Sequence, residues 1–170
     1  DRLSRVYTLE DGRKATFIVE RNDEIKLGAS GVSLVVLSRW VKLTGDTSFL
    51  PFMEQLAVGI GLMQRDSGSF VHVLNAADLS LKEEERIVYY DGEALFGLMQ
   101  LYSVTRDERW LQMSERAFSA FIARKHWKNH DHWLSYAANE ITQYKPEDEY
   151  YIFGLKKVSG DPDFILERET

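Results

Sequence analysis

The 170-residue chain is 44% hydrophobic and 28% charged, a composition typical of a folded globular domain with a substantial core. Its net charge of −6, with no run of more than two Lys or Arg residues, argues against nucleic acid and anionic membranes as partners. The lack of cysteine excludes disulfides, zinc–thiolate sites and cysteine nucleophiles.

Membrane and targeting signals are not evident in the chain. The longest apolar runs, such as residues 32–37, are too short to span a bilayer, so no membrane insertion is expected. The first residue is Asp1 rather than Met, which indicates a cut domain or a processed product. Both a cytoplasmic and a secreted or periplasmic origin are compatible with this sequence.

The start of the chain predicts a β-hairpin. Two β-prone runs, at residues 6–9 and 15–19, flank Asp11-Gly12, a dipeptide that favours a tight turn because both positions accept positive φ. After residue 25 the apolar period becomes helical. The chain is therefore divided into a hairpin segment, a helical domain and an acidic tail, at residues 1–25, 26–160 and 161–170.

Six helices are predicted, joined alternately by short turns and longer connections. Asp107 is expected to be an N-cap, and Pro51 and Pro146 suit first helical turns. A strand at 70–74 with a partner at 87–89 is expected in the long connection after the second helix. The helices are expected at residues 27–43, 48–64, 92–104, 108–124, 131–144 and 146–160.

A helix–turn–helix unit recurs three times. The turn Thr44-Gly45-Asp46 aligns with Thr105-Arg106-Asp107, and Gly31 then aligns with Gly92. The first helix of each unit is rich in small residues that allow close packing, whereas the second helix carries more charge. Such repeats indicate stacked helical hairpins, with the first helices inside and the second helices outside.

The repeat resembles a known architecture. Its inner and outer helices, the Thr44-Gly45-Asp46 turn and the loop Gln-Arg-Asp-Ser-Gly-Ser-Phe at residues 64–70 are similar to the α/α toroid superfamily of six-hairpin glycosidase-like proteins. That group includes unsaturated glucuronyl hydrolases, N-acylglucosamine 2-epimerases and polysaccharide lyases. The expected fold is therefore all-α, with three inner/outer hairpins of toroid type and a short N-terminal β-hairpin.

The chain departs from that architecture in one respect, because it holds three hairpins where a closed toroid has about six. A half-toroid or a fragment is expected, with inner helices exposed at both edges. The expected partner is accordingly a second copy of the chain, or additional hairpins from a longer parent chain.

The resemblance places a ligand cleft over the N-termini of the inner helices. Helix N-termini independently suit hydroxyls and anions, because they present unpaired N–H groups and the positive end of the dipole. Carboxylates, imidazoles and aromatic rings are the groups that a sugar-processing site uses. The residues expected at this face are Asp66, Phe70, His72, Tyr89, Tyr90, Asp91, Glu93, His130, Asp131, His132 and Trp133.

Several residues of that set also have a structural explanation. An N-cap role is favoured for Asp91 and Asp131, and packing is the default role of His72. Glu93 is harder to explain as a cap. Its carboxylate is expected either to be paired with another group or to have a function, and the two alternatives are given equal weight. No metal site is predicted, since His130 and His132 are two residues apart and do not share a helical face.

The leading hypothesis is a domain that binds or processes a saccharide, of hydrolase, lyase or epimerase type, without a cofactor. Glu93 and Asp131 are the acid/base candidates. The alternative is a non-catalytic structural or protein-interaction module. The residues expected to contact the sugar are Tyr90, His132, Trp133, Asp66, Phe70 and His72.

Overall fold

The computed structural model describes residues 3–168, with side chains through residue 159. Helices dominate this part of the chain, but five short strands accompany them, so the fold is predominantly helical rather than purely all-α. The elements in chain order are β1 (Ser4–Thr8), β2 (Lys14–Ile18), β3 (Glu24–Lys26), α1 (Leu27–Thr44), α2 (Leu50–Leu62), β4 (Val73–Asn75), β5 (Leu81–Glu83), α3 (Tyr90–Thr105), α4 (Glu108–Ala123), the short 3-10 helix η1 (His126–Lys128), α5 (His132–Ile141) and α6 (Asp148–Arg168).

The N-terminal β-hairpin is confirmed. β1 and β2 pair in antiparallel register, with Ser4 opposite Ile18 and Thr8 opposite Lys14, and Gly12 takes a φ of 82° in the turn. β2 packs on α2 through Phe17, which is fully buried. The hairpin therefore covers an outer helix.

The second sheet differs from the expected one. β4 pairs with β3 on one side and β5 on the other, in the order β3-β4-β5. Residues 87–89 are not a strand, so their prediction as one was wrong, and Ile87 O instead accepts a hydrogen bond from Tyr90 N at the entry to α3. A run of three apolar residues does not indicate which strand it would pair with. In the structure, β3 and β5 supply the backbone partners of β4.

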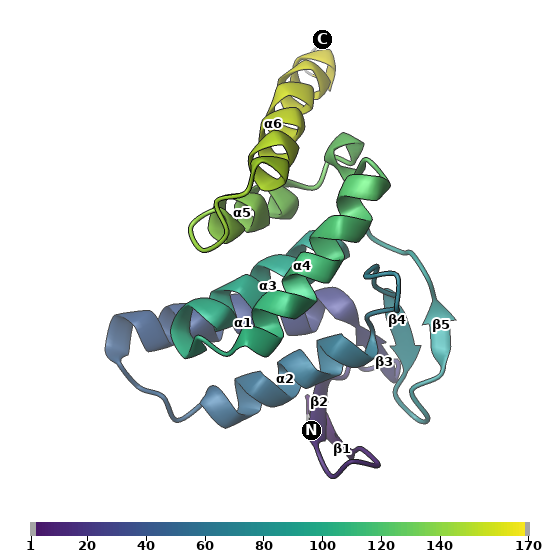
Figure 1. Ribbon diagram of the computed structural model, residues 1–170. Coiled ribbons are helices and arrows are strands. Elements are labelled where there is room, and N and C mark those ends of the chain that lie inside the picture. The colour runs from purple at the N-terminus through teal and green to yellow at the C-terminus, as the bar shows by residue number, and fades with distance from the viewer. Residues whose placement is uncertain (1–2, 169–170) are drawn as a thin grey trace.

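The six α-helices of the described region form three hairpins, and the first helices of these hairpins lie in a row. α1 packs against α3 and α3 against α5, while α2, α4 and α6 each pack against the helix before them (Figure 1). The closest approach is between α1 and α3, where a β-carbon added to Gly31 would lie 2.6 Å from Ala94 N. The predicted use of small residues for close packing of the inner helices is thereby confirmed.

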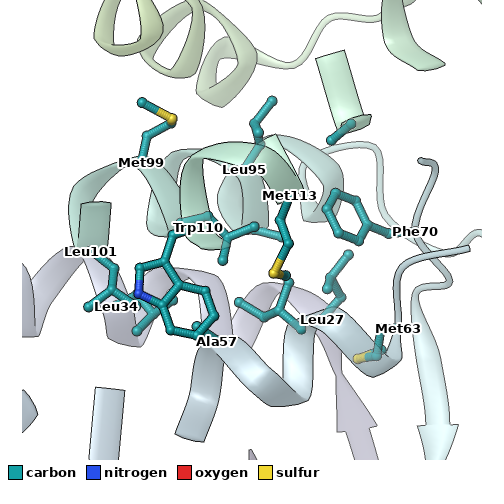
Figure 2. Close-up of a cluster of buried hydrophobic side chains, with 14 of the residues drawn as sticks. Leu27, Leu34, Ala57, Met63, Phe70, Leu95, Met99, Leu101, Trp110 and Met113 are labelled. Carbon is teal, nitrogen blue, oxygen red and sulfur yellow. The ribbon is translucent and has the colours of Figure 1, made fainter. Parts of the chain in front are cut away.

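The main core lies between the first two hairpins. Figure 2 shows part of it, with Leu34 from α1, Ala57 from α2, Leu95 from α3 and Trp110 from α4. All four side chains are at most 2% exposed. Because each hairpin contributes residues to the same cluster, neither hairpin buries its apolar face alone.

The last helix is longer than expected. α6 continues to Arg168, so its predicted end near residue 160 was wrong, and the acidic segment from residue 161 is helical through residue 168. A single glycine costs a helix only about 1 kcal/mol and does not by itself terminate it. Figure 1 shows the second half of α6 extending beyond the other helices.

Candidate functional site

The N-terminus of α3 lies at the centre of the predicted site. The helix begins at Tyr90, two residues earlier than expected, and its N-cap Tyr89 makes no side-chain capping hydrogen bond. Asp91 therefore lies inside the first turn, where its carboxylate faces His72 and His126. The favoured interpretation of Asp91 as an N-cap was wrong, because the helix starts before it.

Asp131 ties two inner helices together. Its Oδ1 accepts a hydrogen bond from Trp133 N at 2.9 Å, which caps α5, and its Oδ2 accepts one from Gly92 N of α3 at 3.1 Å. The side chain is fully buried, and burial raises its pKa to about 7 against the opposing effect of these N–H donors. The capping role is confirmed, whereas the acid/base role stays a prediction that these surroundings do not support.

Glu93 has no such partners. It lies one turn into α3, where it packs with Tyr90 against the backbone of Gly28 on α1. Its carboxylate is half-buried and makes no hydrogen bond or ion pair within residues 3–159. Burial raises the pKa of Glu93 above its ordinary value, so the carboxyl group retains its proton to a higher pH than an exposed glutamate does.

An aromatic surface flanks Glu93 on α3 and α5. Tyr89, Glu93 and Phe96 recur at intervals of four and three residues and therefore share one face of α3. The five rings of this surface contact one another at centroid distances of 5.2–6.1 Å. The aromatic surface consists of Tyr89, Phe96, His132, Trp133 and Tyr136.

Part of this surface was anticipated from the sequence. His132 and Trp133 were expected to contact a ligand, and the structure brings them together beside α3. Phe96 and Tyr136 were missed, although Tyr136 follows Trp133 by three residues, a spacing that places both on one helical face. Tyr136 and Tyr89 are accessible, at 51% and 39% exposed, as is His132, whereas Phe96 and Trp133 are partly buried.

A second cluster lies on the other side of the first turn of α3. His72 Nε2 is 3.4 Å from Asp91 Oδ1, and His126 Nδ1 is 3.9 Å from Asp91 Oδ2. His72 is 3% exposed, and its Nδ1 accepts a hydrogen bond from Arg86 N at 2.9 Å. This imidazole–carboxylate cluster of His72, Asp91 and His126 includes one residue, His126, that was not among the predicted site residues.

A charged network holds the segment that orients His72. Arg86 binds the buried carboxylate of Glu24 at 2.7 Å and also binds Glu83, and Lys82 binds Glu24 at 2.7 Å. The guanidinium of Arg86 holds the pKa of Glu24 well below its usual range. Arg86 is thereby fixed. Because its backbone N–H donates to Nδ1 of His72, Nε2 is the ring nitrogen that is available to Asp91.

Two predicted contact residues lie away from these clusters. Phe70 is 5% exposed and packs against Phe121 at 6.3 Å between ring centroids, so it cannot stack on a ligand. Asp66 lines a surface hollow with Arg116 of α4, on an outer helix. The loop after α2 turns toward the outer layer before it enters β4, which keeps both residues away from these clusters, so their sugar contacts stay predictions that these positions do not support.

Comparison of the chain with models of known protein families and with curated proteins finds no match. Within the described residues, no helix is long and apolar enough to cross a membrane. No group of three or more His, Asp or Glu side chains in that region is arranged to hold a metal ion. The chemistry of the site is therefore inferred from its geometry.

Proposed function

We propose that this chain is a carbohydrate-active domain that binds or processes a saccharide over the inner helices. One observation carries the proposal: Glu93 is a half-buried carboxyl group without a partner, and its spacing places it on the same face of α3 as Tyr89 and Phe96, two rings of the partly exposed aromatic surface. A sugar offers an apolar ring face that packs on aromatic side chains, and hydroxyls that a carboxyl group binds.

Glu93 is suited to proton transfer within that arrangement. A carboxyl group whose pKa is raised by burial holds its proton closer to neutral pH and can act as a general acid. Hydrolase, lyase and epimerase chemistry all require such a group next to a bound sugar. We therefore propose Glu93 as the acid/base residue, with Tyr90, His132 and Trp133 positioning the sugar.

The proposed fold family is the α/α toroid. Support comes from the row α1–α3–α5, in which each inner helix packs on the next and carries its own outer helix. Further support comes from the placement of Glu93, the aromatic surface and the imidazole–carboxylate cluster at or near the N-terminal ends of these inner helices. The three hairpins would form half of a six-hairpin ring.

Glycan-array screening followed by isothermal titration calorimetry tests the binding proposal. We expect Trp133→Ala and Tyr136→Ala each to weaken binding of the best array ligand about tenfold, which corresponds to about 1.4 kcal/mol of lost stacking. Tyr151→Ala is the matched control, since Tyr151 is 47% exposed on α6 and takes part in none of the ring contacts of the aromatic surface. An array without any saccharide ligand would overturn the proposal.

Glu93→Gln separates binding from processing. The substitution keeps the size and polarity of the side chain but removes its titratable proton, so bound saccharide should remain while any turnover is lost. Turnover that persists in Glu93→Gln would remove Glu93 from the proposed mechanism and leave binding intact.

The alternative proposal is a non-catalytic structural or protein-interaction module. It is favoured by the apolar side chains that α1 and α6 expose, among them Leu43 and Leu155, each 71% exposed. A module of this kind would bind no saccharide on the array and would form a stable complex through those helices.

A further inference from the structure

The imidazole–carboxylate cluster lines a surface cavity of about 550 Å³. The cavity lies beside the first turn of α3, and its volume falls within the range of small-molecule sites. No residue of the aromatic surface lines it, so it is distinct from the surface beside Glu93. Its polar lining comprises His72, Glu85, Arg86, Asp91, Arg124, His126 and Asn129.

Two groups in this cavity retain unused hydrogen-bonding capacity. His126 Nδ1 is buried and has no hydrogen-bond partner among the described residues. Its nearest charged neighbour, Asp91 Oδ2, is 3.9 Å away, which is too far for a hydrogen bond. Buried polar atoms are normally satisfied, so this gap identifies a position for a group that bonds both atoms.

The ring of His126 is held in place for such a contact. It stacks on Phe121 of α4 with a centroid distance of 4.9 Å and an interplanar angle of 13°. Asp91 is held from its other side by His72, at 3.4 Å. The two atoms that face the gap therefore belong to side chains whose orientation is already fixed, which lowers the entropic cost of binding.

The charges around the cavity favour a neutral ligand over a phosphate. Arg86 is engaged by Glu24 and Glu83. Burial lowers the pKa of His126, so its imidazole is neutral at pH 7. Among the other charged side chains that line the cavity, the single cation Arg124 is outnumbered by the carboxylates of Asp91 and Glu85, which leaves no excess of positive charge for an anion.

A hydroxyl group matches these requirements. It donates one hydrogen bond and accepts others, so it can bond a carboxylate and an imidazole at the same time. We propose that the cavity is a saccharide subsite, in which one hydroxyl of the bound sugar bridges His126 Nδ1 and Asp91 Oδ2. This subsite deepens the proposed function and rests on it, with Asn129 and Arg124 available to further hydroxyls.

The subsite and the Glu93 surface flank the same turn of α3. Tyr90 contacts His72 at 5.4 Å between ring centroids and also packs, with Glu93, against Gly28. One ligand residue over the aromatic surface and another in the cavity would therefore lie on neighbouring sides of one helix end. The expected ligand class is an oligosaccharide rather than a single sugar.

Histidine ¹⁵N NMR of the intact chain tests the subsite, with glucose, N-acetylglucosamine and galactose, all neutral sugars, as separate probes. Binding of a probe in the cavity should shift the Nδ1 resonance of His126 and leave that of His130 unchanged. His126→Gln and Asp91→Asn should each weaken binding of that probe at least tenfold. Tyr151→Ala, on α6 and outside the lining of the cavity, should weaken it by less than twofold.

The outcomes distinguish the two proposals. A probe that binds without moving the His126 resonance, and with unchanged affinity in His126→Gln, overturns the subsite but not the saccharide function. Failure of all three probes and of every array glycan overturns both. If Asp91→Asn fails to fold by circular dichroism, the resonance of His126 in the unmodified chain still decides the question.

Discussion

At the scale of single residues, Glu93 and Asp131 show how two carboxyl groups at neighbouring helix N-termini take different roles. Asp131 is fully buried and each of its oxygens accepts a backbone N–H, so its presence is explained by the two helices that it joins. Glu93 gains no such contact and yet is partly withdrawn from water. A group that is desolvated without compensation is a candidate for function, because stability alone does not account for it.

This difference predicts that Glu93→Gln is more stable than the parent chain at pH 7. Burial raises the pKa of Glu93 in the folded state above its value in the unfolded chain. The protonated carboxyl group therefore contributes its full stabilisation at a pH below the unfolded-state pKa, and this stabilisation is lost as the pH rises through the folded-state pKa. Glutamine avoids that loss. The gain should stay below about 1 kcal/mol because the group is partly screened by solvent, and urea unfolding at pH 4 and pH 7 measures it. A gain of equal size at both pH values would contradict this account.

Asp131→Ala is expected to cost about 2–4 kcal/mol. The substitution removes the cap of α5, worth about 1 kcal/mol, and also leaves Gly92 N buried without a partner. Asp107→Ala is the matched control, because Asp107 caps α4 through Arg109 N at 3.0 Å but bridges to no other helix, so about 1 kcal/mol should be lost. Chemical unfolding of both variants provides the comparison, and equal costs would show that the link to α3 contributes nothing.

The sequence was informative about residues whose role is local and less so about those whose role depends on distant partners. The caps Asp107 and Asp131 could be identified because capping needs only the next two or three residues. His126 was missed because its partners, Asp91 and Phe121, lie on other elements. The burial of Phe70 could not be foreseen for the same reason, since it depends on Phe121.

At the scale of helices and strands, the crossing of α1 and α3 is the contact with the least tolerance. Gly31 of α1 meets Gly97 of α3 backbone to backbone, and a β-carbon on Gly97 would lie 3.0 Å from Gly31 Cα. Interiors are close-packed, so a methyl group at this position forces the helices apart. The spacing of Glu93 from Gly28 depends on the same crossing.

Gly31→Ala should therefore destabilise the chain by about 2 kcal/mol, lowering Tm by roughly 4–8 °C, despite the better helix propensity of alanine. Gly154→Ala on α6 is the control, because its added methyl would meet only Ala138 Cβ at 3.7 Å. That variant should gain about 0.5–1 kcal/mol from helix propensity. Thermal unfolding by circular dichroism distinguishes the two, and a Gly31→Ala variant as stable as the parent would show that the crossing is not tight.

Helices and the first hairpin could be predicted because their signals are short-range. Periodicity over four residues places a helix, and a two-residue turn pairs two adjacent strands. The three-stranded sheet could not be predicted in the same way, since β3 and β4 are far apart in the chain and neither is longer than three residues. The end of α6 could not be predicted, because glycine often follows a helix end and yet α6 continues past Gly160.

At the scale of the whole molecule, the first and the last hairpin both expose apolar side chains. Val36, Trp40 and Leu43 share a face of α1 and are 61%, 47% and 71% exposed. At the other edge, Leu155 and Val158 of α6 line a groove with Ala138 of α5. Where two hairpins follow each other in the molecule, their facing surfaces are buried against one another. Each exposed edge lacks such a neighbour.

We therefore expect the isolated chain to self-associate head to tail, the α1 edge of one copy packing on the α5–α6 edge of another. Such a contact would repeat the interface between successive hairpins, and two copies would complete a six-hairpin ring.

Sedimentation velocity over a range of concentrations should show a monomer–dimer equilibrium. Leu43→Lys and Leu155→Lys should each shift it to monomer, because each buries a charge in an apolar contact. Leu81→Lys, at a side chain 48% exposed on β5, should leave the equilibrium unchanged. A chain that stays monomeric at all concentrations would assign these edges to hairpins of another protein segment rather than to a second copy.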